Sequence, residues 1–439
     1  MILFIFRLLY RWKVIEMNRD SHIYKSFVQI LKEELIPAMG CTEPIALAYG
    51  GAKAREVLGC IPDKVKVYAS GSIIKNVKSV IVPHTHSLKG IPAAVAAGII
   101  GGDASKELEV ISYVSEDKMN EMDDYLLKDN IDVEFLETDS VFDMVIEVYR
   151  NNDYAKVRIK DYHTNIVLIE KNHEILFEKK EDIVKMTRTD RSLLSMEDIY
   201  NFAENLDVRD VEEVLNRQIE YNIAISEEGL RGNYGANIGK VLLGVDQSIY
   251  TRAKAKAAAG SDARMNGCNL PVIINSGSGN QGITVSVPVI EVARELKVSH
   301  EKLLKALALS NLTAIHQKTG IGTLSAYCGA VSAAAGAGAG IAYLYGGDYE
   351  MIIHTVVNAL AIVSGIVCDG AKASCAAKIA SSVDAAILGY EMFKAGQEFK
   401  SGDGIVMNGV EETIKSVGHL GKQGMKETNK EIIKLMINC

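Results

Sequence analysis

Aromatic residues are scarce in this chain of 439 residues: they make up 6% of the sequence, with a single tryptophan. Glycine is abundant by comparison, with 37 copies. This combination argues against a β-sandwich and favours closely packed helices. The apolar fraction of 48% is ample for a large core, and the length allows two or three domains.

A surplus of basic charge is also missing. The net charge of -8 argues against nucleic acid as a main partner, because neutralising phosphates requires a basic surface. Long uninterrupted apolar runs are lacking too: residues 329–340 are rich in glycine, and residues 351–367 are interrupted by His354 and Asn358. Buried helices explain both segments, so we expect no membrane association.

Paired cysteines are not apparent either. The seven cysteines are odd in number and spread over the whole length, which makes a secreted disulfide framework a poor explanation. We therefore expect a cytoplasmic protein whose thiols are free to bind metal or do chemistry. At the amino terminus, the apolar residues 1–10 are followed by basic ones, unlike a signal peptide. We expect Met17 to be the natural start and residues 1–16 to be an over-extended reading frame.

Helical patterns occupy most of the chain, and a change of composition sets one segment apart. Strand-like alternation with charged residues recurs in residues 107–114, 132–136, 143–149 and 154–170, with an acidic helical stretch at 116–129. The predicted fold class is therefore α+β: a mainly helical, Ala/Gly-rich catalytic core formed by residues 17–101 and 186–439, with an inserted small α+β domain at 102–185. No residue combination in that insert suggests chemistry.

Three cysteines define the most distinctive stretch. Cys328 is followed by the Ala/Gly tract 329–340, and Cys368 and Cys375 follow further along the chain. Small side chains let backbones approach one another or a bulky group closely, and this stretch is interpreted as the wall of a metal-cluster pocket. Ordinary burial of cysteine in a core is the competing interpretation, and the spacing fits no standard zinc site.

Two further features suit a site for a small anionic substrate. Cys41 precedes a predicted helix, where the helix dipole is expected to lower the pKa of its thiol and make it a candidate base. The Gly/Ser/Asn loop at 275–282 exposes backbone N–H groups and hydroxyls, which suits a carboxylate or phosphate, although a flexible turn is an equally good interpretation. A [4Fe-4S] cluster held by only three cysteines keeps one open iron, which suits an elimination reaction.

Four segments in order carry a resemblance to a known family: 40–44 (GCTEP), 71–76 (GSIIKN), 276–282 (SGSGNQG) and 366–375 (IVCDGAKASC). Together they resemble the L-cysteine desulfidase family, which is related to the α-domain of iron-sulfur L-serine dehydratases. The resemblance implies a lyase independent of pyridoxal phosphate, with a [4Fe-4S] cluster, that converts L-cysteine to pyruvate, ammonia and sulfide. It further implies that Cys328, Cys368 and Cys375 hold the cluster and that Cys41 is the base.

The same segments supply the predicted substrate-binding residues, which are Glu43, Lys75, Asn76, Ser276, Ser278 and Asn280. The serine dehydratases that this chain resembles carry a longer stretch, which contains proline, between their last two cluster cysteines. The short segment 369–374 therefore favours the cysteine-acting branch of the family. Two alternatives stay open: an L-serine dehydratase-type ammonia-lyase, and a non-catalytic iron-sulfur redox or sensing protein. A homo-oligomer is compatible with the sequence. Cys60, Cys268 and Cys439 match no ligand position.

Overall fold

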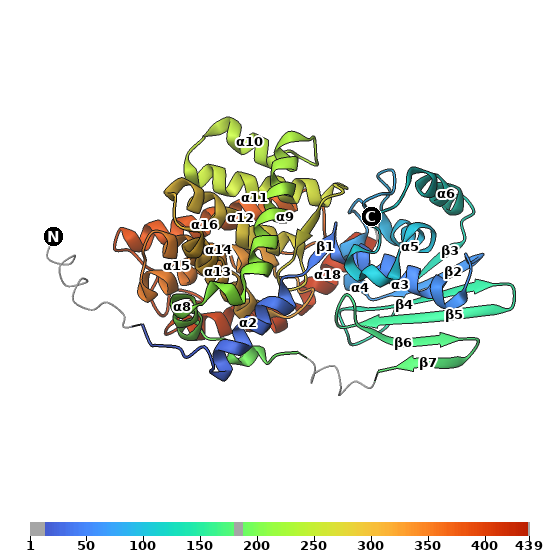
Figure 1. Ribbon diagram of the computed structural model, residues 1–439, viewed down its shortest axis with the longest axis horizontal. Helices are drawn as coiled ribbons and strands as arrows, with labels where there is room; N and C mark the ends of the chain where they lie inside the picture. The colour runs from blue at the N-terminus through green and yellow to red at the C-terminus, as the bar shows by residue number, and fades with distance from the viewer. Residues whose placement is uncertain (1–13, 180–187, 438–439) are drawn as a thin grey trace.

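The computed structural model describes residues 14–179 and 188–437, which form a helical lobe and a sheet lobe lying side by side (Figure 1). Cys439 and residues 1–13 of the segment predicted to be over-extended lie outside the described residues. The predicted class, a mainly helical α+β fold, is confirmed. In the parts of the chain described, every helix is too short or too polar to span a bilayer.

The helical lobe contains most of the helices. They are α2 (His22–Glu34), α8 (Met196–Asn205), α9 (Glu212–Arg231), α10 (Ile238–Val245), α11 (Ile249–Met265), α12 (Gly279–Leu296), α13 (His300–Ile321), α14 (Gly329–Leu344), α15 (Tyr349–Val363), α16 (Cys375–Lys394), α17 (Val410–His419) and α18 (Lys426–Ile437). Short 3-10 turns occur at η2 (Arg191–Leu193) and η3 (Val208–Asp210), and a π-helical turn, η4 (Leu420–Gly424), joins α17 to α18.

The sheet lobe is built on six strands in the order β3-β2-β4-β5-β6-β7. They are β2 (Lys64–Ala69), β3 (Ile131–Phe135), β4 (Asp143–Arg150), β5 (Asp153–Lys160), β6 (Ile166–Lys171) and β7 (Glu174–Glu178), and only β2 and β3 run parallel. The helices of this lobe are α3 (Thr42–Leu58), α4 (Gly71–Val77), α5 (Gly90–Gly101) and α6 (Glu116–Leu126), with the 3-10 turn η1 (Ala104–Glu109).

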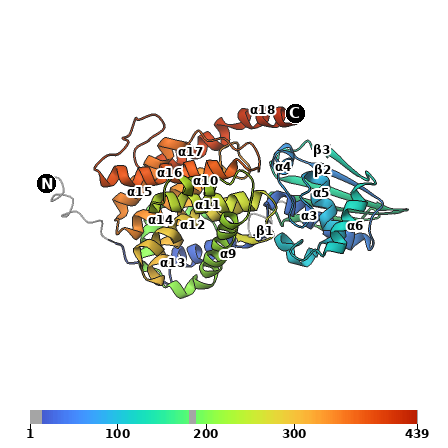
Figure 2. The same cartoon turned by 90° about the horizontal axis from the view of Figure 1, so that it is seen from above.

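Strand pairing and helix packing both join the lobes. The short strands β1 (Pro37–Met39) and β8 (Pro271–Ile273) pair antiparallel, which places the start of α3 beside the start of α12. On another side, α18 extends from the helical lobe and packs on α4 (Figure 2). Segments far apart in the sequence therefore meet between the lobes.

The sheet extends beyond the segment predicted to form a separate insert. Strand β2 lies inside the sheet, and α3 packs on β4 and β5, where Ala155, Val157 and Ile159 alternate as buried residues. Residues before 102 thus contribute to the sheet lobe, and the division into domains at 102 and 185 stays a prediction. The prediction of a strand at 107–114 is wrong, because η1 and turns occupy these residues. The strand-like run 154–170 is a hairpin of β5 and β6 with a turn at 161–165.

Helix α14, which carries the Ala/Gly tract, is the central helix of the helical lobe. It packs against α12, α13, α15 and α16, and nearly all of its residues are buried. At Gly336 the backbone of α13 comes so close that an added Cβ would lie 2.5 Å from the carbonyl oxygen of Ser310. Small residues are therefore required here by the close approach of neighbouring helices.

A matched pair of substitutions tests this packing. Gly336→Ala is expected to lower the free energy of unfolding by about 1–3 kcal/mol, because the methyl group forces the two helix backbones apart. Gly244→Ala is the control: Gly244 is also helical, but an added Cβ there meets nothing within 4 Å, so helix propensity should raise stability by about 0.5–1 kcal/mol. Chemical denaturation of both variants checks this; equal shifts would contradict the packing argument.

Candidate active site

Four cysteines from three distant parts of the chain line one small cavity of about 110 Å³. They are Cys41, Cys328, Cys368 and Cys375, and none of them forms a disulfide. Five of the six predicted substrate-binding residues line the same cavity: Glu43, Asn76, Ser276, Ser278 and Asn280. A volume of this size holds several water molecules or one small amino acid.

A short β-bridge brings Cys328 and Cys368 together. Tyr327 and Val367 pair antiparallel, the Cys328 N–H donates to the Ile366 carbonyl (3.1 Å), and the Cys368 N–H donates to the Ala326 carbonyl (2.6 Å). The loop before α14 and the loop after α15 are thus tied directly to each other. This local pairing explains how two cysteines separated by two long helices reach the same cavity wall.

The loop from Cys368 to Cys375 is held against the sheet lobe. Gly370 has a φ of +90°, and an added Cβ would lie 2.3 Å from the Lys75 carbonyl oxygen, so only glycine fits. The Lys75 ammonium donates to the carbonyl of Cys368 (3.2 Å) and to Asn429 Oδ1 (2.7 Å). Lys75 is the one predicted substrate residue that is not among those lining the cavity, and what it does in this structure is clamp the loop.

Cys41 occupies the N-cap position of α3, as predicted, and is buried. Its thiol donates to Glu43 Oε2 across 3.1 Å. Burial, and then the negative charge of Glu43, raise the pKa of the Cys41 thiol well above its usual range, although the Arg264 guanidinium acts in the opposite direction. The prediction that the helix start lowers this pKa is therefore wrong: desolvation outweighs the helix dipole.

Glu43 is fully enclosed between Cys41 and a histidine from the sheet lobe. His163, in the turn between β5 and β6, lies with Nε2 3.8 Å from Glu43 Oε1, and its ring packs edge-on against Phe142. Burial alone would raise the pKa of Glu43, but the contact with His163 and the bond from Cys41 hold it down at about 2. The carboxylate is therefore charged, and the insert that suggested no chemistry contributes a residue to the site.

The predicted Gly/Ser/Asn loop leads directly into α12. Ser276 and Gly277 both adopt positive φ, and Ser278 occupies the N-cap position of the helix, whose first residues face the cavity. Asn275 anchors the loop by donating to Asn311 Oδ1 (3.0 Å). Thr42 ties it to α3 by donating to the Gly277 carbonyl (3.0 Å). The loop is thus held in place at both ends and presents a helix N-terminus to the cavity.

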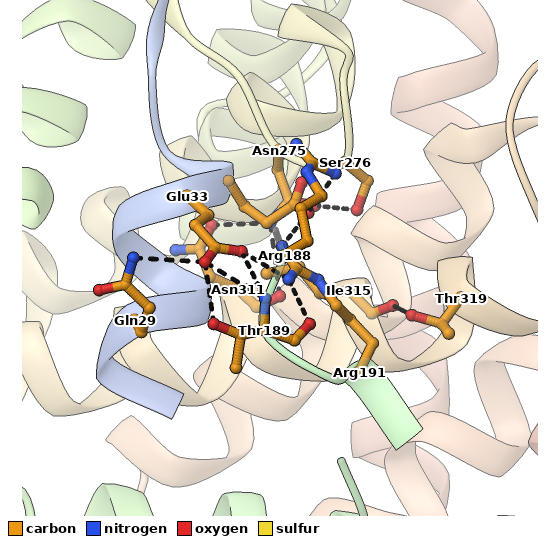
Figure 3. Close-up of polar contacts among 11 residues, drawn as sticks. Gln29, Glu33, Arg188, Thr189, Arg191, Asn275, Ser276, Asn311, Ile315 and Thr319 are labelled. Carbon is orange, nitrogen blue, oxygen red and sulfur yellow. Dashed lines mark hydrogen bonds and ion pairs between the residues drawn. The ribbon is translucent and has the colours of Figure 1, made fainter. Parts of the chain in front are cut away.

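A larger outer cavity of about 640 Å³ adjoins the inner one. Both are lined by a shared set of residues: His163, Ser276, Gly277, Lys318 and Thr323. On one side of the outer cavity Glu33 accepts hydrogen bonds from Arg191 Nη1 (2.5 Å) and the Thr189 hydroxyl (2.8 Å), as Figure 3 shows. The outer cavity therefore provides a route to the thiols that passes His163 and Lys318.

The thiol set can be compared with what an iron-sulfur cluster requires. Within the residues that the structure describes, no three His, Cys, Asp or Glu side chains lie close enough to bind one metal ion together. A cluster makes a different demand, because each thiolate binds its own iron and the ligands surround a larger group. Cys328, Cys368 and Cys375, which face one cavity from different backbone segments, fit that demand.

The charges around the cavity also fit an anionic, thiolate-bound group. Burial, and then the proximity of Cys368, raise the pKa of the Cys328 thiol, so three thiolates are unfavourable here without a metal. Basic side chains surround the site: Lys75, Arg264, Lys318, Lys372 and Lys378. Asp369 forms ion pairs with Lys372 and Lys378, and burial lowers the pKa of Lys75 and of Lys318. Lys378 also donates to the Val367 carbonyl (2.8 Å), beside Cys368.

Three residues of the site were missed by the sequence: His163, Arg264 and Lys318. His163 sits in a charged hairpin turn, and its place beside Glu43 depends on the packing of α3 against the sheet, which no local pattern reveals. The sequence carried a weak signal for Arg264, because a charged residue near the end of an alanine-rich helix that is otherwise buried is unusual. Of the remaining cysteines, Cys60 is exposed and Cys268 is buried in the hydrophobic core, away from both cavities.

Comparison with known proteins identifies the family. The serine dehydratase alpha chain family matches residues 105–434. A UPF0597 protein of Desulfitobacterium hafniense is 58% identical over 424 residues, covering 96% of this chain and 99% of that protein. A UPF0597 protein of Lachnoclostridium phytofermentans is 54% identical, covering 95% of this chain and 100% of that protein. A third, of Treponema denticola, is 48% identical, covering 96% of this chain and 100% of that protein. The chain therefore belongs to the serine dehydratase alpha chain family and, within it, is closely similar to UPF0597 proteins.

Proposed function

We propose that the protein is an iron-sulfur lyase, independent of pyridoxal phosphate, that degrades L-cysteine to pyruvate, ammonia and hydrogen sulfide. The observation that carries this proposal is the convergence of four unpaired thiols on one cavity of amino-acid size. Membership of the serine dehydratase alpha chain family supports an ammonia-lyase type of reaction. The short segment 369–374 between Cys368 and Cys375 supports cysteine over serine as the substrate.

Cys328, Cys368 and Cys375 would hold a [4Fe-4S] cluster, and Cys41 would remain free for chemistry. When bound, the cluster would supply an open iron as a Lewis acid for the substituent on the substrate β-carbon. The protein's own part is to bind the substrate, exclude water and move the α-proton. The thiolate is the form of cysteine that binds metal, and Lys75 and Lys378, which donate to the carbonyls of Cys368 and Val367, add positive charge beside these cysteines.

The reaction breaks the Cα–H and Cβ–S bonds of L-cysteine and releases hydrogen sulfide. The 2-aminoacrylate that remains tautomerises to an imine, and water hydrolyses this to pyruvate and ammonia. Cys41 Sγ takes the α-proton in this proposal. Because its thiol is protonated in the resting protein and donates to Glu43, the thiolate is a minor form. His163 keeps Glu43 charged, and this carboxylate holds the Cys41 side chain in place.

A substrate competition experiment tests the proposal against the second candidate function, L-serine dehydration, which the family name favours. Anaerobic protein with a loaded cluster is given L-cysteine, L-serine and L-cystine, separately and in mixtures. We expect sulfide and pyruvate from L-cysteine, with L-serine a weaker competitor that yields pyruvate more slowly. Pyruvate from L-serine with no sulfide from L-cysteine would reject the cysteine assignment and leave the serine assignment standing.

A further inference from the structure

An unpaired arginine is buried in the wall of the inner cavity. The side chain of Arg264, the penultimate residue of α11, is 2% exposed and lines the cavity beside Cys41 and Ser278. Within the described part of the chain, two of its three guanidinium nitrogens, Nε and Nη2, are buried and have no hydrogen-bond partner. A buried charge without a partner is strongly unfavourable, so this guanidinium indicates an anion that the cavity is built to receive.

The surroundings of Arg264 also favour a bound anion. Gly279, the first residue of α12, lies so close that an added Cβ would be 2.3 Å from Arg264 Nε. The guanidinium therefore lies against the N-terminus of an 18-residue helix, where the helix dipole also favours negative charge. Arginine presents its N–H groups as a planar fork that matches the two oxygens of a carboxylate.

Unpaired acceptors lie in the same cavity. Oδ1 of Asn280 and Oε1 of Gln281 are buried and have no hydrogen-bond partner among the described residues. Both residues line the cavity, and they directly follow Gly279 in the first turn of α12. An ammonium group donates hydrogen bonds and accepts none, so the two amide oxygens suit an ammonium group. Together with the guanidinium, they complement a molecule that carries both a carboxylate and an ammonium group.

We propose that Arg264 is the carboxylate-binding residue for the zwitterion of an α-amino acid, whose ammonium group is bound by the amide oxygens of Asn280 and Gln281. The inference rests on the proposed function in placing an amino acid in this cavity, and deepens it by assigning its two charged ends. It requires a substrate with both a free carboxylate and a free ammonium group.

Binding of unreactive probes to the cluster-loaded protein tests this assignment. L-Alanine has both charged groups but nothing to eliminate, whereas L-alaninamide lacks the carboxylate and propionate lacks the ammonium group. By anaerobic titration calorimetry, we expect L-alanine to bind about 10–100-fold more tightly than either truncated probe, because each loses charge-assisted hydrogen bonds to a buried partner. Arg264→Met is expected to weaken L-alanine binding about 10–100-fold and to leave L-alaninamide binding unchanged.

The variants separate recognition from a structural role. Arg264→Met should unfold at an equal or higher temperature than the wild type without ligand, since it replaces an unpaired buried charge with an apolar side chain of similar volume. Arg264→Lys should retain part of the L-alanine affinity. Arg252→Met, on the same helix but ion-paired with Glu291 and Glu295 and outside both cavities, is the control and should bind L-alanine like the wild type.

Three outcomes would overturn the assignment. They are Arg264→Met binding L-alanine as tightly as the wild type, Arg264→Met losing L-alanine and L-alaninamide equally, and the wild type giving no saturable binding of L-alanine up to its solubility. Failure of the proposed function is a separate result: sulfide release from L-cysteine could be absent while L-alanine binding still depends on Arg264.

Discussion

Replacing Cys368 with alanine is expected to abolish both cluster assembly and the release of sulfide from L-cysteine. Of the three proposed ligands, only Cys328 and Cys375 would then remain, so the cluster would lose one of the thiolates that hold it. We expect iron content and product formation to fall below about one hundredth of the wild-type values. This loss is larger than the loss seen when a residue that merely hydrogen-bonds to a metal ligand is replaced. Iron, acid-labile sulfide and pyruvate are measured after anaerobic reconstitution.

Cys60→Ala is the control for this experiment. Cys60 is a free cysteine that lies exposed on the surface and lines neither cavity, so its loss removes a thiol without touching the site. It should keep full iron content and activity. Circular dichroism and thermal unfolding of Cys368→Ala exclude a folding defect. A Cys368→Ala protein that is folded and retains iron and sulfide release would contradict the assignment of the ligands.

Replacing Cys41 with alanine is expected to separate catalysis from cluster binding. Loss of the residue that moves the α-proton should lower kcat by about 10²–10⁴-fold while the iron content stays at the wild-type level. Cys268→Ala is the matched control, because Cys268 is equally buried and its thiol pKa is also raised by burial, but it lies outside the cavity. Loss of iron in Cys41→Ala would instead make Cys41 a ligand.

The pH dependence of the wild type gives a second test of Cys41. Because burial and Glu43 raise the pKa of its thiol, the reactive thiolate is a minor form near neutral pH, and its fraction grows about tenfold for each unit of rising pH. Consequently, kcat/KM should increase steadily between pH 7 and pH 9, and the residual activity of Cys41→Ala should lack this slope. A wild-type profile that is flat or falls over this range would contradict Cys41 as the base.

The parts of the site that the sequence predicted are those with a local signal. Cys41 lies at a helix start because 42–44 carries a helix-starting pattern, and the Gly/Ser/Asn loop is a turn because its residues tolerate positive φ. The Ala/Gly tract predicted close helix packing for the same reason, since small side chains are needed wherever backbones approach. The mainly helical class followed from periodicity over most of the chain.

The parts that sequence reasoning missed or misjudged depend on tertiary contacts. His163 reaches Glu43 only because α3 packs on the sheet, and Lys75 turns to Asn429, a residue near the other end of the chain. The pKa of Cys41 was predicted with the wrong sign because the helix start was visible in the sequence while the extent of burial was not. That Arg264 has no partner is a property of the folded cavity, and no pattern of residues encodes it locally.

The most direct test of the central claim is the product balance of anaerobically reconstituted protein acting on L-cysteine. We expect sulfide and pyruvate in equal amounts, formed only when the cluster is loaded and lost when oxygen destroys it. A protein with a full complement of iron and acid-labile sulfide that releases neither product from L-cysteine would contradict it.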